Sequence, residues 1–184
     1  QFAGPLLLTY FGSAIIATPL WIKLSRRMEK HRLWCYTMIY ASVVFSYATF
    51  IGSGDLIAFF LICLLGGSAL SADLAIPSSI QADLVDIETA RSGKRMTGTF
   101  FSFWSMATKG SVALSSGVGL LILSYFNFSV VGANTSTALW ALTGLYALLP
   151  ILLKFCAIGL MWNFKLTRSY HQKIQQDLTK NSST

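Results

Sequence analysis

The sequence has few of the residues on which enzymes and metal sites are built. Its 184 residues include two histidines and three cysteines, and the cysteines form no C-x-x-C pair. It contains no phosphate-binding glycine loop, no H-E-x-x-H motif and no G-x-S-x-G motif. These absences argue against an enzyme, and we expect neither a metal site nor a cofactor.

Charged residues are also scarce, at 11% of the chain, whereas 54% of the residues are hydrophobic and the mean hydropathy is +0.59. This balance excludes an ordinary water-soluble domain and indicates an all-α membrane protein. A helix needs roughly 20 apolar residues to cross a bilayer. Five stretches within residues 1–164 meet this requirement, at about 4–22, 35–52, 56–80, 98–126 and 137–163. Residues 165–184 are polar, and we expect them to form a cytoplasmic tail.

The net charge of +7 comes mainly from cations that all lie on one side of the predicted bundle. The connections at 53–55 and 127–136 contain no Lys or Arg. The positive-inside rule therefore places the basic connections and the C-terminus in the cytoplasm, with the spans in the plasma or inner membrane. No nucleic-acid partner is expected, because no basic surface interleaved with aromatic residues accompanies these cations. Between the spans they are Lys23, Arg26, Arg27, Lys30, Arg32, Arg91, Lys94 and Arg95.

This orientation places Gln1 on the outer side, directly before a helix. No charged leader with a small-residue cleavage site is present to deliver that end across the membrane. The number of predicted spans is odd, and the sequence does not begin with Met. We therefore expect the chain to be the C-terminal part of a longer protein whose N-terminal half completes the bundle.

Lys109 stands near the middle of the fourth predicted span. Counted from Gly98, it lies about 16 Å into the bilayer, close to the midplane. An ammonium group at that depth costs about 2.5–3.5 kcal/mol, so we expect it to face a partner or a wet cavity. Ser102, Ser105 and Ser116 share its helix face and form a polar stripe with it. We interpret this stripe as lining an aqueous path; the alternative is an ion pair that only fixes helix packing.

Two further ionisable residues interrupt predicted spans. Lys154 is close enough to the inner boundary at Asn163 for its stem to bend toward the interface, and we interpret it as a snorkelling or packing lysine. Asp73 lies in the inner third of its span, one turn before Pro77. It is a candidate either for pairing with a basic group or for contacting a permeating ion.

Acidic residues gather at the inner end of the third span. Asp83 and Asp86 are three residues apart and share one helix face, and Glu88 follows. With the nearby cations they could latch the inner ends of the helices together in one state of an alternating-access transporter. They could equally form a solvated run of charges, in which each exposed pair contributes about 0–1 kcal/mol. The spacing favours neither interpretation.

Several segments resemble a known family of transporters. "PLWIKLSRRMEKHRLW" resembles the basic loop between the second and third helices of each half of a major facilitator transporter. "SADLAIPSSIQADLVDIETARSGKRMTGTFFSFWSMATKGSVAL" is similar to the A-D-x-x-D, the G-x-R and the following lysine of the glycoside–pentoside–hexuronide:cation symporters, the melibiose-permease-like family. "LLPILLKFCAIGLMWNFKLTRSYHQKI" also fits the last helix and tail of that family.

The resemblance implies a major facilitator fold of twelve helices, in which these five are the eighth to the twelfth. It implies that Lys109, Ser105 and Thr108 face the substrate and cation cavity. Sugar-binding members stack an aromatic residue of the tenth helix on their ligand, whereas residues 61–85 contain none. Trp104, which borders the lysine stripe, is the candidate to replace it. The remaining cavity candidates are Ser102 and Asp73.

The resemblance also implies that Asp83, Asp86 and Arg95 belong to a charge network that gates the cytoplasmic side. Arg26 and Arg27 of the first basic connection are added to this set. The family match gives the latch interpretation more weight than the solvated one.

The function that follows is secondary active transport by alternating access. We expect symport of a sugar or glycoside with Na⁺ or H⁺, in which the cation-binding carboxylates lie on the N-terminal half. One alternative is a major facilitator carrier of lipids or other amphiphiles. The other is a membrane structural subunit whose buried charges only fix helix packing.

Overall fold

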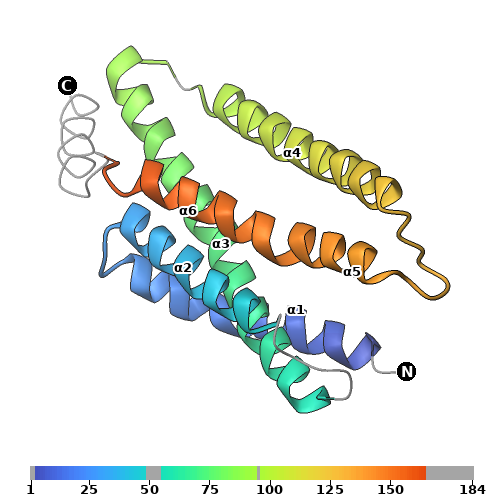
Figure 1. Cartoon of the computed structure of the whole chain (residues 1–184). Coiled ribbons are helices and arrows are strands. Elements are labelled where there is room, and N and C mark those ends of the chain that lie inside the picture. Colours follow the sequence, from blue (N-terminus) through green and yellow to red (C-terminus); the bar gives the residue numbers. More distant parts are fainter. Residues whose placement is uncertain (1–2, 49–54, 95, 165–184) are drawn as a thin grey trace.

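The computed structural model describes residues 3–48, 55–94 and 96–164, and these residues form helices without a strand (Figure 1). The predicted tail lies outside the described residues, as do Arg95 and residues 49–54. The elements in chain order are α1 (Ala3–Ser25), α2 (Lys30–Ala48), α3 (Leu56–Ser92), α4 (Thr97–Tyr125), α5 (Ser136–Thr143), a π-helical turn η1 (Gly144–Leu148) and α6 (Leu149–Met161).

Four helical stretches in the described part are long and apolar enough to cross a membrane. They are Gly4–Ser25, Leu56–Ser92, Thr97–Tyr125 and Ser136–Met161. α2 is not among them, since its 19 residues begin with Lys30, His31 and Arg32, which lower its hydropathy. The outer end of the second predicted span falls on residues 49–52, outside the described residues. The architecture is that of a multi-pass membrane protein.

α3 continues well beyond the predicted span at 56–80. Its 37 residues extend about 55 Å at 1.5 Å per residue, well over the roughly 30 Å thickness of a hydrocarbon core. The helix ends at Gly93, whose φ of 69° is left-handed and whose N–H donates to the Thr89 carbonyl. Asp83 and Asp86 therefore lie on a helical extension rather than in a loop.

The last span is interrupted by the π-helical turn η1. The Leu149 N–H donates to the Gly144 carbonyl, five residues back instead of four. Pro150 follows directly; it has no N–H to donate, and in a regular helix its ring would clash with the carbonyl four residues earlier. The last span therefore accommodates Pro150 with a wide turn immediately before it.

α1 and α3 cross in close contact at two adjacent glycines. A Cβ added at Gly67 would collide with the Tyr10 carbonyl group, whose carbon would lie only 2.8 Å away, and with the Ser13 hydroxyl. A Cβ at Gly66 would meet the Tyr10 ring at an ordinary 3.4 Å. The backbones of the two helices can approach this closely only because residue 67 has no side chain.

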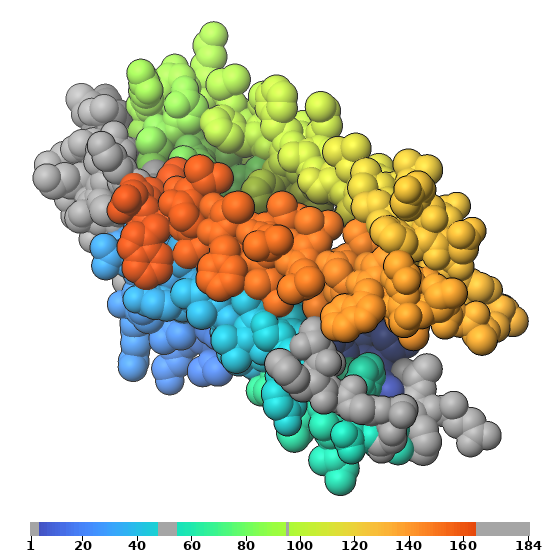
Figure 2. Space-filling model, viewed as in Figure 1, coloured from blue at the N-terminus to red at the C-terminus, as the bar shows by residue number. Residues whose placement is uncertain are grey.

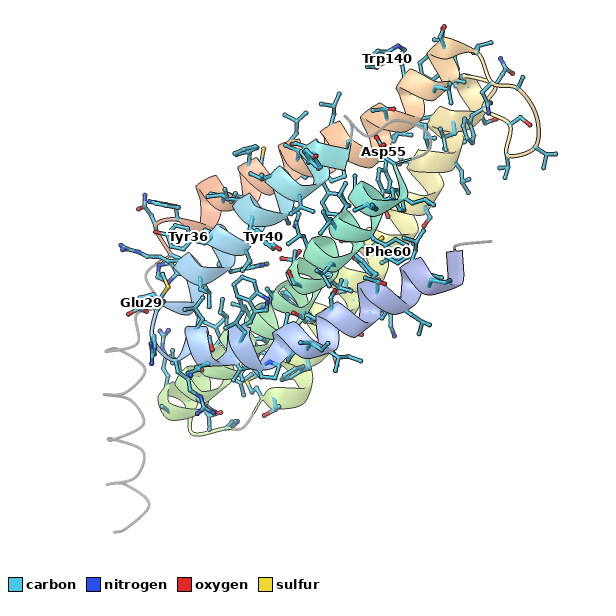
Figure 3. The ribbon with its side chains drawn as sticks, turned by 90° about the horizontal axis from the view of Figure 1, so that it is seen from below. Glu29, Tyr36, Tyr40, Asp55, Phe60 and Trp140 are labelled. Carbon is cyan, nitrogen blue, oxygen red and sulfur yellow. The ribbon has the colours of Figure 1, made fainter. Side chains whose placement is uncertain are left out.

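Polar side chains add cross-links around Ser68 of α3. The Trp21 indole N–H donates to the Ser68 carbonyl at 2.8 Å, from α1. The Tyr40 hydroxyl of α2, labelled in Figure 3, lies 2.9 Å from the Ser68 hydroxyl. Because unpaired polar groups are costly inside a membrane, these bonds favour one packing of α1, α2 and α3.

One core cluster of buried apolar side chains lies toward one end of the bundle. We call this the basic end, because it carries Lys23, Arg26, Arg27, Lys30 and Arg32 near the turn between α1 and α2. The core contains Leu33 of α2 and Ala72, Ile76 and Ile80 of α3. Met28 and Met161 pack against it from the α1–α2 turn and from the last residue of α6. Four segments of the chain therefore meet at the basic end.

α4 is the least enclosed helix. It lies along one side of the bundle (Figure 1), and its side chains form much of the upper surface in Figure 2. None of its residues is buried, and its packing within this chain is against α3 and α5. α4 thus leaves most of its surface open, including the predicted lysine stripe.

Candidate functional site

The lysine stripe of α4, formed by Ser102, Ser105, Lys109 and Ser116, lies on the open surface of this helix. Ser105 is half-buried and the other three are exposed. No described residue forms an ion pair with Lys109. The charge of Lys109 is therefore not balanced by an ion pair within the described residues. We continue to interpret this face of α4 as one that meets a wet cavity or a partner elsewhere in the protein.

The neighbouring candidates Trp104 and Thr108 are also exposed on α4. The Thr108 hydroxyl donates to the Trp104 carbonyl at 2.9 Å, a bond within the helix that leaves its oxygen able to accept another. Trp104 lies nearer the basic end and lines an apolar cavity together with residues of α2, α3 and α6. Thr108 therefore offers a hydroxyl group and Trp104 an apolar ring at different positions along α4.

Asp73 is held by two other helices. One carboxylate oxygen forms a salt bridge with the Lys154 ammonium group of α6 at 2.9 Å. The other accepts a hydrogen bond from the Trp34 indole N–H of α2 at 3.3 Å. The side chains of Lys154 and Asp73 are 22% and 32% exposed. Of the two possibilities for Asp73, the structure displays the pairing with a basic group. It does not pair Asp73 with Lys109.

Of the two interpretations of Lys154, snorkelling or packing, the structure displays packing, through an ion pair with another helix. Its ammonium group binds a carboxylate 81 positions earlier in the chain. The sequence marked each residue as a charge in need of a partner, since Asp73 and Lys154 both interrupt apolar spans, but it did not pair them with each other. An unpaired charge at that depth is costly, and pairing the two reduces the cost for both. Trp34 carried no such signal, because an interfacial anchor and a hydrogen-bond donor have the same sequence pattern.

At the basic end, Asp83 pairs with Lys30. The ammonium group lies 2.6 and 2.8 Å from the two carboxylate oxygens, and 3.5 Å from the Ser79 carbonyl. This pair ties the start of α2 to the helical extension of α3. Sequence reasoning placed Lys30 in the basic connection but did not select it, because five cations there were equally near in sequence.

The other predicted gate residues are known from their exposure alone. Arg26, Arg27 and Asp86 are exposed at the basic end, and Arg95 lies outside the described residues. The structure therefore places Asp83 in an ion pair that joins two helices of this chain.

His31 lies beside these charges and is almost completely buried, at 5% exposure. Its ring packs edge-on against Phe164 at a centroid distance of 6.4 Å, and its Nδ1 has no partner among the described residues. Burial lowers the pKa of His31 below the usual 6.5, an effect that Glu29 opposes and Arg32 reinforces. No group of three or more His, Cys, Asp or Glu side chains suited to a metal ion occurs in the described part.

Comparison with known proteins decides the family. Residues 3–168 match the family described as "MFS/sugar transport protein". The chain belongs to this major facilitator family. The match confirms the resemblance to major facilitator transporters inferred from the basic loop and the lysine-bearing helix, and the family is one of transporters.

Two curated relatives of this major facilitator chain are named as symporters. The "uncharacterized symporter sll1374" of Synechocystis is 23% identical over 184 residues, covering 97% of this chain and 34% of the relative. The "putative glycoside/cation symporter YagG" of Escherichia coli is 29% identical over 100 residues, covering 54% of this chain and 22% of the relative. The chain thus spans about a third of the length of the first relative and less of the second.

Proposed function

We propose that this chain is part of a secondary active transporter that carries a sugar or glycoside together with Na⁺ or H⁺ by alternating access. The observation that supports this most directly is the family match over residues 3–168, joined by two relatives whose names include "symporter". One of these names also contains "glycoside/cation", which motivates the proposed substrate class. The transport unit is proposed to include the rest of the protein, since the relatives are about two and a half to three times as long as this chain.

The open stripe on α4 fits this proposal. An intramembrane lysine is normally paired or placed in a wet cavity, and Lys109 finds no ion pair within the described chain. We propose that this face lines the solute cavity, with Lys109, Ser102 and Ser105 toward the solute and Thr108 beside them. The carboxylates that bind the cation are proposed to lie in the N-terminal half. By the positive-inside rule, the basic end faces the cytoplasm of a cell with this protein in its plasma or inner membrane.

Uptake by the full-length protein tests the proposal. Cells carrying it would be given a panel of labelled sugars, glycosides and lysolipids, with and without Na⁺ or a proton gradient. Lys109→Ala is expected to reduce cation-driven sugar uptake by about tenfold or more, equal to at least ~1.4 kcal/mol, at unchanged membrane levels. Lysolipid uptake in place of sugar uptake would identify an amphiphile carrier. Loss of the folded protein alone would identify a packing role for Lys109.

A matched pair of serine variants tests whether the lysine stripe, rather than the opposite face of α4, contacts the solute. Ser105→Ala lies on the stripe, whereas Ser111→Ala lies on the opposite side of the helix, where the hydroxyl donates to the Ala107 carbonyl. We expect Ser105→Ala to raise the solute concentration needed for half-maximal uptake, and Ser111→Ala to leave it nearly unchanged. Equal effects of the two would remove the assignment of the cavity to the lysine face.

A further inference from the structure

An open face of the bundle runs along α2 and α6, which lie side by side in Figure 2. Four exposed residues of α2 follow one another at helical spacing, so they share one side of that helix. Two exposed residues of the α6 segment are seven positions apart and share a side in the same way. We call these residues the α2–α6 face: Arg32, Tyr36, Ile39 and Val43 on α2, Phe155 on α6, and Trp162 directly after α6.

An aromatic pair joins the two helices at the basic end of this face. Tyr36, labelled in Figure 3, packs edge-on against Trp162 at a centroid distance of 6.2 Å. The two residues are still 46% and 43% exposed, so both rings can contact a molecule outside the bundle. Aromatic rings of this kind are typical of the level where acyl chains meet headgroups. The remaining apolar residues of the face continue from the pair toward the opposite end of the bundle.

A cation without a salt-bridge partner lies where the face reaches the basic end. Arg32 is exposed and stands one helical turn before Tyr36, on the same side of α2. Neither of the salt bridges found among the described residues involves Arg32. Residues 23–32 contain five cations and one acidic residue, Glu29, so the local charge is positive. A guanidinium group binds phosphate oxygens through two parallel hydrogen bonds, which makes a phosphate a suitable partner for Arg32.

We propose that the α2–α6 face binds an anionic phospholipid. Its phosphate accepts hydrogen bonds from Arg32, and an acyl chain lies along the apolar residues beyond the Tyr36–Trp162 pair. Charge complementarity selects the headgroup, because a zwitterionic lipid would bring an ammonium group into the same positive region. The site does not depend on which solute the protein transports.

Thermal unfolding of the full-length protein in lipid nanodiscs tests the site, with phosphatidylglycerol as the probe. The discs contain phosphatidylcholine alone or phosphatidylcholine mixed with phosphatidylglycerol. A ligand that binds only the folded state raises the unfolding temperature, and we expect phosphatidylglycerol to raise it by about 2 °C or more. Glycerol phosphate added to the phosphatidylcholine discs should cause no shift, because it lacks the acyl chains. Absence of a shift with phosphatidylglycerol, or an equal shift with glycerol phosphate, would overturn the proposal.

Two pairs of matched variants locate the effect. Arg32→Gln is expected to abolish most of the phosphatidylglycerol shift, whereas Arg91→Gln removes an exposed arginine outside the α2–α6 face and should retain it. Trp162→Ala should reduce the shift, whereas Trp140→Ala, at an exposed position of α5, should not. The shift is compared within each variant, so a lower starting stability does not affect the result. Equal losses in Arg32→Gln and Arg91→Gln would show diffuse attraction to a charged membrane and contradict the assignment.

Discussion

At the scale of single residues, the ionisable groups within the spans differ in how their charge is balanced. Asp73 has an ammonium partner and an indole donor, on two different helices. Lys109 has no ion-pair partner among the described residues. Since both positions are unfavourable for an isolated charge, the contrast suggests different roles. Asp73 and Lys154 join α3 to α6 through an ion pair, whereas Lys109 lies on the open surface of α4.

The Asp73–Lys154 pair leads to a stability prediction. Lys154→Ala leaves the carboxylate without its cation, and we expect it to cost about 1–3 kcal/mol, less than for a fully buried pair because both side chains are partly exposed. Adding Asp73→Asn removes the uncompensated charge while its amide oxygen still accepts from Trp34. The double variant should therefore unfold at a higher temperature than Lys154→Ala alone. The idea is wrong if the second substitution lowers the unfolding temperature further.

His31 leads to a prediction about pH. Because burial lowers its pKa below 6.5 in the folded protein, the unfolded chain binds the proton more tightly. The stability associated with a neutral His31 is thus complete above about pH 6.5 and is lost as the pH falls from there toward the lowered pKa. We expect the unfolding temperature of the wild type to decline as the pH falls below about 6.5.

His31→Phe is the matched variant for this experiment. It keeps an aromatic ring beside Phe164 but cannot titrate, and His31 Nδ1 has no described hydrogen bond to lose. The decline in unfolding temperature below pH 6.5 should be shallower for His31→Phe than for the wild type. Parallel curves for the two proteins would remove His31 as the source of the pH dependence.

At the scale of helices, the crossing of α1 and α3 depends on one missing side chain. Gly67→Ala would force a methyl group against the Tyr10 carbonyl, and we expect it to destabilise the protein by about 1–3 kcal/mol through overpacking. Gly66→Ala is the control, since its methyl group meets the Tyr10 ring at 3.4 Å. Alanine is also a better helix former than glycine by about 1 kcal/mol. Thermal unfolding should rank Gly66→Ala above Gly67→Ala; the reverse order would contradict the crossing.

At the scale of the whole molecule, charge asymmetry predicts orientation. Lys94 at the basic end and Val130 in the α4–α5 loop are both exposed, and we expect them on opposite sides of the membrane. In a cysteine-free background, an impermeant maleimide applied to intact cells should label Val130→Cys at once. Lys94→Cys should be labelled only after permeabilisation. Labelling of Lys94→Cys in intact cells would reverse the proposed topology.

Much of the architecture was predictable from composition and spacing. The helical class follows from long apolar runs, since a lipid environment requires the backbone to satisfy its own hydrogen bonds. Lys109 was recognised because hydropathy makes a charge within a span conspicuous. The partners of Asp73 and Asp83 were not predictable, because Lys154 lies 81 residues from Asp73, and Lys30 is one of several cations near Asp83.

By itself, the sequence determined that this protein is a helical membrane chain with one basic side and a lysine within a span. These properties depend on the identity of residues and their order along the chain. Apolar runs of sufficient length form helices that span a bilayer, and the distribution of the cations orients them. Only the tertiary structure decided that Asp73 pairs with Lys154, that Gly67 touches the backbone of α1, and that Gln81 donates to the Phe100 carbonyl of α4. Each depends on which faces of distant helices meet, and periodicity within one helix does not specify its neighbour.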